Sequence, residues 1–179
     1  MITINKTNRL YFILSVLFLG SLLRFIPHEP NFVPFGAMAL FGGAYLSNKK
    51  LAFIAPLLAI FFSDILLQIF FGYGFHAGMP FVYGSYAIIV LIGIALRNRV
   101  ITKNVFIASI SASVLFFVVT NFGTWLQGFY GYTLEGLSAC YIAAIPFFRG
   151  TLTGDLVYNL IFFGGFAIAQ AKLPSLVKE

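Results

Sequence analysis

Long apolar stretches alternate along the chain with short connections that carry charged residues, glycine or proline. A membrane-spanning helix needs about 20 mostly apolar residues, and about 17–25 are tolerated. Five stretches meet this requirement, at residues 9–27, 51–71, 80–97, 104–127 and 150–171. A sixth, at residues 33–48, is shorter, but Pro34 suits a first helical turn, and Lys49 and Lys50 can extend to the membrane surface. The pattern predicts an all-α integral membrane protein with six spanning helices.

Residues 133–146 form the one apolar segment that does not fit this pattern. The segment is too short to span a membrane, and Pro146 is expected to end any helix that it forms. Counting it as a span would place Lys172 and Lys178 on the opposite side from most other basic residues. We therefore predict a short interfacial or re-entrant helix, inside a long connection between the fifth and sixth spans.

The composition agrees with a lipid environment. Of the 179 residues, 60% are hydrophobic and 9% are charged, whereas a soluble globular protein has roughly 25% charged residues. This excludes a soluble enzyme, a disordered tail and a disulfide scaffold. A single transmembrane domain, residues 1–179, is expected to account for the whole chain.

The basic residues predict the orientation. If the N-terminus is cytoplasmic, nine of the eleven Lys and Arg residues fall on the cytoplasmic side, as the positive-inside rule requires. These nine are Lys6, Arg9, Lys49, Lys50, Arg97, Arg99, Lys103, Lys172 and Lys178. We therefore expect a helical bundle with both termini cytoplasmic. The net charge of +6 then reports orientation, and no nucleic-acid partner is expected.

Polar residues inside the spans concentrate in their outer halves. Asp64 and Gln68 lie four residues apart and share one face of the third span. Asn121 and Trp125 are related in the same way on the fifth span. The candidate substrate-binding residues are Arg24, His28, Asp64, Gln68, Tyr83, Asn121, Trp125, Arg149, Asp155 and Asn159.

Ionisable side chains at such a depth cost roughly 2.5–3.5 kcal/mol each, so they normally pair with one another or line a wet cavity. Two acids, Asp64 and Asp155, and two bases, Arg24 and Arg149, are available. A ring of charge pairs that only locks the bundle is one interpretation. The other is a cavity, open to the outside, that holds a small polar or zwitterionic molecule.

Motifs for cofactors and metals are missing from the sequence. It contains no G-x-x-x-x-G-K-[ST] phosphate loop, no G-x-S-x-G nucleophile elbow and no H-E-x-x-H zinc motif. His28, His76 and Cys140 lack the spacing of metal ligands. We expect no cofactor, no bound metal ion and no catalytic residue, and an ATP-driven step would need a partner protein.

Motifs along nearly the whole chain are similar to those of an uncharacterised family of small bacterial membrane proteins. The most specific is P-H-x-P-N-F-x-P at Pro27–Pro34, within the stretch Arg24–Tyr45. The other shared elements are Ser63-Asp64, Met79–Gly84, Val119–Phe122, Trp125, Ile145–Phe148 and Gly154-Asp155. The domain that defines this family has no known function, so the resemblance implies no activity.

In architecture the chain resembles the S components of energy-coupling factor vitamin transporters. This resemblance implies an S-component-like bundle of six helices in the cytoplasmic (inner) membrane of a bacterium, with a ligand site near the extracytoplasmic face. It also implies partnership with a transmembrane coupling subunit and cytoplasmic ATPases. The first span lacks the A-x-x-x-A surface that many S components use to contact the coupling subunit. A solitary uptake protein therefore fits as well.

The leading hypothesis is a substrate-binding and uptake protein for a small nutrient such as a vitamin or a precursor. Segments 28–34 and 133–148 are expected to cover the site as lids. A membrane enzyme whose outward-facing acids and histidines act on a lipid-borne substrate is the first alternative. A structural or assembly protein without a ligand is the second, and it predicts no cavity in the outer half.

Overall fold

The computed structural model describes residues 6–177, which form helices joined by short connections. The α-helices are α1 (Lys6–Leu22), α2 (Phe35–Tyr45), α3 (Lys49–Phe71), α4 (Met79–Ala95), α5 (Thr102–Leu126), α6 (Leu134–Asn159) and α7 (Gly165–Lys172). A π-helical turn, Leu160–Gly164, joins α6 to α7 without a break. Short 3₁₀ helices lie at Leu23–Phe25 and Pro174–Leu176, and the described residues contain no β-strand. The all-α prediction is confirmed.

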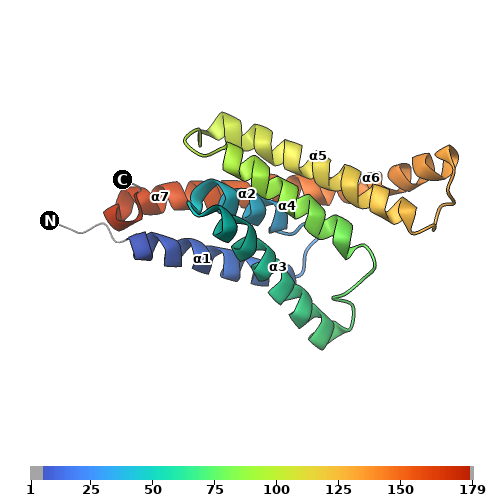
Figure 1. Ribbon diagram of the computed structural model, residues 1–179, viewed down its shortest axis with the longest axis horizontal. Coiled ribbons are helices and arrows are strands. Elements are labelled where there is room, and N and C mark those ends of the chain that lie inside the picture. The colour runs from blue at the N-terminus through green and yellow to red at the C-terminus, as the bar shows by residue number, and fades with distance from the viewer. Residues whose placement is uncertain (1–5, 178–179) are drawn as a thin grey trace.

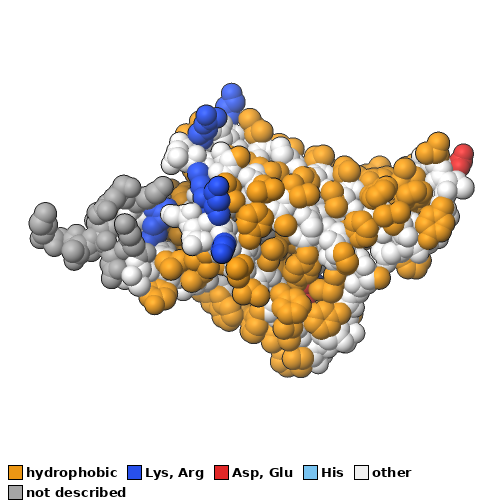
Figure 2. Space-filling model, in the orientation of Figure 1, with side chains coloured by type: hydrophobic (Ala, Val, Ile, Leu, Met, Phe, Trp, Pro, Cys, Tyr) orange, Lys and Arg blue, Asp and Glu red, His pale blue; other side chains and the backbone are white. Residues whose placement is uncertain are grey.

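Four helical stretches are long and apolar enough to cross a membrane: Thr7–Phe25, Lys49–Phe71, Thr102–Leu126 and Leu134–Lys172. The two remaining helices, α2 and α4, are apolar but shorter. Large hydrophobic side chains cover the exterior of the molecule (Figure 2). A surface of this kind is stable in contact with lipid, so the chain has the character of a membrane protein.

Successive helices run in alternating directions along the long axis of the molecule (Figure 1). The start of α1, the end of α7, and the α2–α3 and α4–α5 connections lie at one end of the bundle. Lys and Arg side chains gather at this end, which we call the basic end (Figure 2). Its residues are Arg9, Lys49, Lys50, Arg97, Arg99, Lys103 and Lys172. We call the opposite end the far end; the side chain of Lys6, and Lys178 altogether, lie outside the described part.

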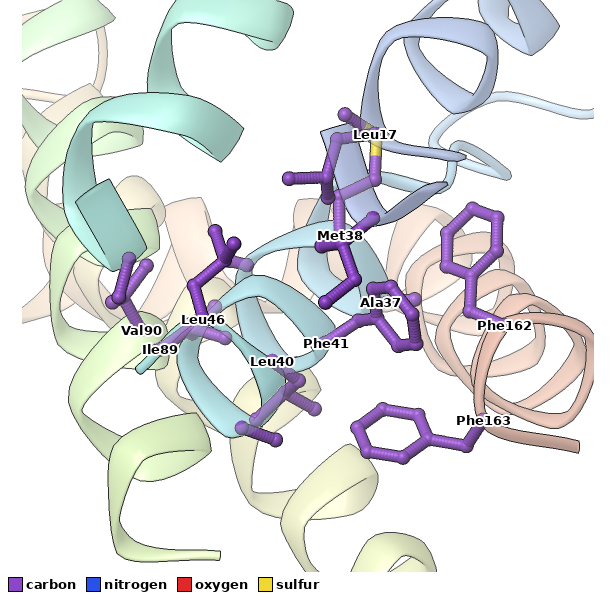
Figure 3. Close-up of a cluster of buried hydrophobic side chains, with 14 of the residues drawn as sticks. Leu17, Ala37, Met38, Leu40, Phe41, Leu46, Ile89, Val90, Phe162 and Phe163 are labelled. Atoms are coloured by element: carbon purple, nitrogen blue, oxygen red, sulfur yellow. The ribbon is translucent and has the colours of Figure 1, made fainter. Parts of the chain in front are cut away.

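Helix α2 is the buried centre of the bundle. Every residue from Phe35 to Ala44 is buried, as expected for a helix that is apolar on all sides. The helix packs most extensively on α4, and Gly43 and Gly93 meet there so closely that neither could carry a Cβ without displacing backbone. Side chains of α2 interdigitate with Leu17 of α1 and with Phe162 and Phe163 of the π-helical turn (Figure 3).

The 11 residues of α2 span only about 16 Å at 1.5 Å per residue, which is roughly half of the hydrocarbon thickness of a membrane. At the basic end, Arg97 donates hydrogen bonds to the carbonyl oxygens of Gly43, Leu46 and Ser47, which fixes the carboxyl end of α2 there. The amino end therefore stops short of the far end of the bundle. This leaves a volume beyond Phe35 that no helix fills.

The prediction that Pro146 ends a separate short helix is wrong. Residues 134–172 form one continuous helix of 39 residues, with Pro146 inside α6. Proline removes one backbone N–H, so the helix loses one hydrogen bond at this position. This part of α6 packs on α5: the Tyr141 hydroxyl donates to the carbonyl oxygen of Val118 at 2.7 Å, and the Cys140 thiol contacts the carbonyl oxygen of Asn121 at 3.4 Å. These contacts stabilise the helix on both sides of the proline.

Candidate functional site

A cavity of about 530 Å³ occupies the volume beyond the amino end of α2. It is lined by the 3₁₀ helix Leu23–Phe25 and the connection from it to α2, by the α3–α4 connection, and by facing residues of α2 to α6. Both connections lie at the far end of the bundle, so the cavity does too (Figure 1). The volume falls within the 300–1,000 Å³ typical of ligand sites. The structural or assembly alternative predicted no cavity here, so this cavity counts against it.

One wall of the cavity carries the only ion pair within residues 6–177, between Arg24 and Asp64. Tyr83 donates a hydrogen bond from its hydroxyl to Oδ2 of Asp64 at 2.5 Å. The Arg24 guanidinium also lies over the ring of Phe35, with 5.2 Å from Cζ to the ring centroid. Asp64 therefore has a cation and a hydroxyl as partners, and Arg24 contacts both Asp64 and an aromatic face. The charges of Arg24 and Asp64 balance, and both side chains are held in place by these contacts.

Another wall of the cavity carries Asp155 of α6, a residue that is only 3% exposed. Its Oδ2 accepts a hydrogen bond from the Ser113 hydroxyl at 2.6 Å. Gly36 packs directly against this carboxylate, and a Cβ there would overlap it. No described residue forms an ion pair with Asp155. The expectation of a second charge pair is therefore not met.

Aromatic side chains form the floor between these walls. Tyr86 stacks on Phe116 with ring centroids 5.0 Å apart, and meets Phe35 edge-on at 6.0 Å. Tyr86 is 4% exposed and lines the cavity. Its hydroxyl has no hydrogen-bond partner among the described residues, whereas that of Tyr83 is bound to Asp64. The floor therefore offers apolar faces and one hydroxyl that remains available.

The mouth of the cavity carries two exposed histidines on different connections, His28 and His76. The ring nitrogens of His28 lie 3.1 Å from the carbonyl oxygen of Arg24 and 2.7 Å from that of Glu29. These contacts stabilise the turn that covers the cavity. Within the described residues, no group of three His, Cys, Asp or Glu side chains is arranged to hold a metal ion.

Five of the ten predicted binding residues line this cavity. They are Arg24, His28, Asp64, Tyr83 and Asp155. Segment 28–34 also contributes, through His28, Asn31 and Val33, as expected for a covering segment. Segment 133–148 does not, because no residue in it lines the cavity. It forms the start of α6 and packs along α5 instead.

Three predicted residues of α3 and α5 serve local structure. Gln68 accepts a hydrogen bond from the backbone N–H of Phe75 and so orders the α3–α4 connection. Asn121 donates to the carbonyl oxygen of Phe117 within its own helix. Trp125 packs between Phe122 and Tyr132. None of the three lines the cavity.

The last two predicted residues, Arg149 and Asn159, lie on α6 on either side of Asp155 in sequence. Arg149 is exposed and forms no ion pair within the described part of the chain. Asn159 is buried, donates to the Ser109 hydroxyl at 2.9 Å, and lines a second cavity of about 350 Å³ between α5 and the π-helical turn. Neither contributes to the site at the far end.

Sequence analysis did not single out Ser113 or Gly36, although both contact Asp155. A serine in an apolar helix often bonds to its own backbone, and a glycine near a helix start is common, so neither stands out. One usable signal was the serine pair Ser109 and Ser113, four residues apart on one face of α5. Each bonds to a polar residue of α6, Asn159 and Asp155 respectively.

Comparison with known proteins gives one match. The model of a protein family described as "Family of unknown function (DUF6580)" matches residues 4–176. No curated protein and no solved structure matches the chain.

Proposed function

We propose that this chain, which belongs to the family of unknown function DUF6580, is a membrane-embedded binding and uptake protein for a small nutrient such as a vitamin or its precursor. The observation that carries the proposal is the cavity of about 530 Å³ with one neutral charge pair and one carboxylate without a cation. A bundle that is only structural gains nothing from burying an unpaired carboxylate beside an empty volume. A ligand site combines apolar walls with a few fixed polar groups, as this cavity does.

The proposed orientation places the basic end in the bacterial cytoplasm and the far end outside, with both termini cytoplasmic. The positive-inside rule supports this, because the basic end collects most of the Lys and Arg residues. All six helical segments then cross the inner membrane, and the short helix α2 reaches the outer surface through residues 26–34. In this orientation the cavity opens to the outside and accepts a nutrient from there.

The proposed energy source is a partner, in the manner of S components of energy-coupling factor transporters. The sequence has no phosphate loop, so ATP hydrolysis would come from cytoplasmic ATPases through a transmembrane coupling subunit. A solitary carrier would share the same binding site. Purification of the tagged chain from its native membrane distinguishes a carrier with ATPase partners from a solitary carrier, because only the carrier with partners co-purifies with ATPase subunits.

The binding step is tested on the purified chain in detergent with a panel of vitamins and vitamin precursors, by thermal unfolding and by isothermal titration calorimetry. We expect at least one compound to stabilise the wild-type chain and to lose this effect in an Asp64→Asn/Asp155→Asn double variant. Glu135→Gln is the matched control, because Glu135 is an exposed acid outside the cavity. If no compound stabilises the wild type more than the double variant, the proposal is wrong.

A membrane enzyme acting on a lipid-borne substrate is the second candidate function. Two histidines and two acids line the same cavity at the far end, and they are His28, His76, Asp64 and Asp155. The engagement of Asp64 by Arg24 and Tyr83 favours binding over proton transfer at that carboxylate. Mass spectrometry of the recovered ligand distinguishes the two. A binding protein returns its ligand unchanged, and an enzyme converts it.

A further inference from the structure

We infer that the ligand of this cavity is an organic cation, whose positive charge binds at the Asp155 carboxylate and whose apolar part packs on Tyr86 and Phe116. This inference rests on the proposed binding function and names the chemical class of the ligand.

The acidic and basic groups of the lining favour a cation. The lining contains one arginine and two aspartates, which are Arg24, Asp64 and Asp155. Arg24 is paired with Asp64, and Tyr83 adds a second donor to the same carboxylate. The Asp155 carboxyl group is therefore the acid of the lining that has no cationic partner among the described residues.

The surroundings of Asp155 also favour a cation. Its hydrogen-bond donor is the Ser113 hydroxyl, a neutral group, and Gly36 at the start of α2 packs against the carboxylate. The amino end of a helix contributes at most about half a positive charge, so α2 offsets the carboxylate only in part. A carboxylate that is 3% exposed pays a desolvation cost that a cation in contact with it would recover. An anionic ligand would add a second negative charge beside it.

The aromatic floor is the third feature that favours a cation. Tyr86 and Phe116 are stacked, and Phe35 stands edge-on to Tyr86 on the same side of the cavity. The face of an aromatic ring attracts a cation within about 6 Å, and the attraction is stronger where water is excluded. Arg24 already uses the ring of Phe35 in this way. A carboxylate beside aromatic faces is the combination that recognises an ammonium or another organic cation.

The test uses probes that differ in charge and share a shape. Choline is compared with its neutral carbon isostere 3,3-dimethylbutan-1-ol, and benzylammonium is compared with benzyl alcohol and with benzoate. Dissociation constants are measured on the full chain in detergent by calorimetry. We expect each cation to bind at least tenfold more tightly than its neutral counterpart, and benzoate to bind more weakly than benzyl alcohol.

Two variants separate charge from folding. Asp155→Asn keeps a side-chain oxygen that can accept the hydrogen bond from Ser113, but removes the charge. We expect it to abolish the preference for cations. Ser113→Ala removes a neutral hydrogen bond and keeps the carboxylate, so we expect the preference to persist. Both variants are first checked for helix content and for a single elution peak.

The outcomes distinguish this inference from the proposed function. If neutral probes or benzoate bind as tightly as the cations, or if Asp155→Asn keeps the preference, the cation inference is overturned and a binding protein of another specificity remains. If neither these probes nor the vitamin panel bind to the wild-type chain, the cation inference and the proposed function both fail. Cation binding that is lost with the Asp155 charge supports both.

Discussion

Asp155 and Arg97 lie at opposite ends of the same buried helix, α2. The Asp155 carboxylate packs directly against Gly36 at the amino end. The Arg97 guanidinium donates to the carbonyl oxygens of Gly43, Leu46 and Ser47 at the carboxyl end. A negative group near the amino end of a helix and a positive group near its carboxyl end both interact favourably with the helix dipole. Neighbouring helices thus fix the depth of α2, and with it the size of the cavity.

Arg97→Gln should lower the free energy of unfolding by about 1–3 kcal/mol, because hydrogen bonds from a charged donor contribute roughly 1.5–3 kcal/mol and glutamine replaces only part of them. Unfolding is followed by circular dichroism during titration with SDS in mixed micelles. Arg99→Gln is the matched control, since Arg99 is exposed at the same end. We expect a change below about 0.5 kcal/mol there. Equal effects of the two variants would contradict the role assigned to Arg97.

Gly36→Ala should disturb the site more than the fold. The new Cβ overlaps the Asp155 carboxylate, so the side chain of Asp155 has to move away from α2. We expect a loss of about 1–3 kcal/mol in unfolding free energy, as for other overpacked positions, together with weaker ligand binding. Gly84→Ala on α4 is the control, because a Cβ there meets no atom within 4 Å. A stabilised Gly36→Ala protein would show that the two residues are not in contact.

Arg24 and Asp64 should show coupled energies in a double-mutant cycle. Arg24→Gln leaves a carboxylate that is 9% exposed with Tyr83 as its remaining partner, which should cost roughly 1–3 kcal/mol. Asp64→Asn in the same chain removes the charge that was left unpaired, so the double variant should recover part of this loss. Additive single effects, within about 0.5 kcal/mol, would mean that the pair contributes no interaction energy.

Cysteine labelling in intact cells tests the orientation. Phe129→Cys places a thiol on the α5–α6 connection at the far end, and Lys50→Cys places one at the basic end. The native Cys140 is buried, so the unchanged chain serves as the unlabelled background. A membrane-impermeant maleimide should label Phe129→Cys directly and Lys50→Cys only after permeabilisation. The reverse result would place the cavity on the cytoplasmic side.

Local patterns predicted the helices well, because a long apolar run in this composition forms a helix almost regardless of its neighbours. The short run at 33–48 was predicted as a helix and is α2, at Phe35–Tyr45. The expectation that proline ends a helix was wrong at Pro146, because it took account only of the hydrogen bond that proline removes. Contacts of α6 with α5, such as that of Tyr141 with Val118, outweigh that loss.

The candidate site was predicted in part. Asp64 and Gln68 share a face of α3, but Gln68 lies four residues, about 6 Å, closer to the far end and bonds to the α3–α4 connection instead of lining the cavity. Arg24 and Arg149 were equal candidates for pairing with the two acids. Arg24 meets Asp64, whereas Arg149 lies on an exposed face of α6. The rotation of each helix about its axis and its position along the bundle decide which side chains meet. Neither can be predicted from a local sequence pattern.

The sequence by itself determined that the chain is helical, that its exterior suits lipid, and that its basic residues collect at one end. These properties follow from composition and periodicity along single segments. Only the tertiary structure decided that the short helix α2 is the central one, and that Asp155 packs at its amino end without a cation. The reason is physical: the space beyond α2 and the partners of Asp155 depend on how α2, α5 and α6 are offset along their axes, to within a single helical turn.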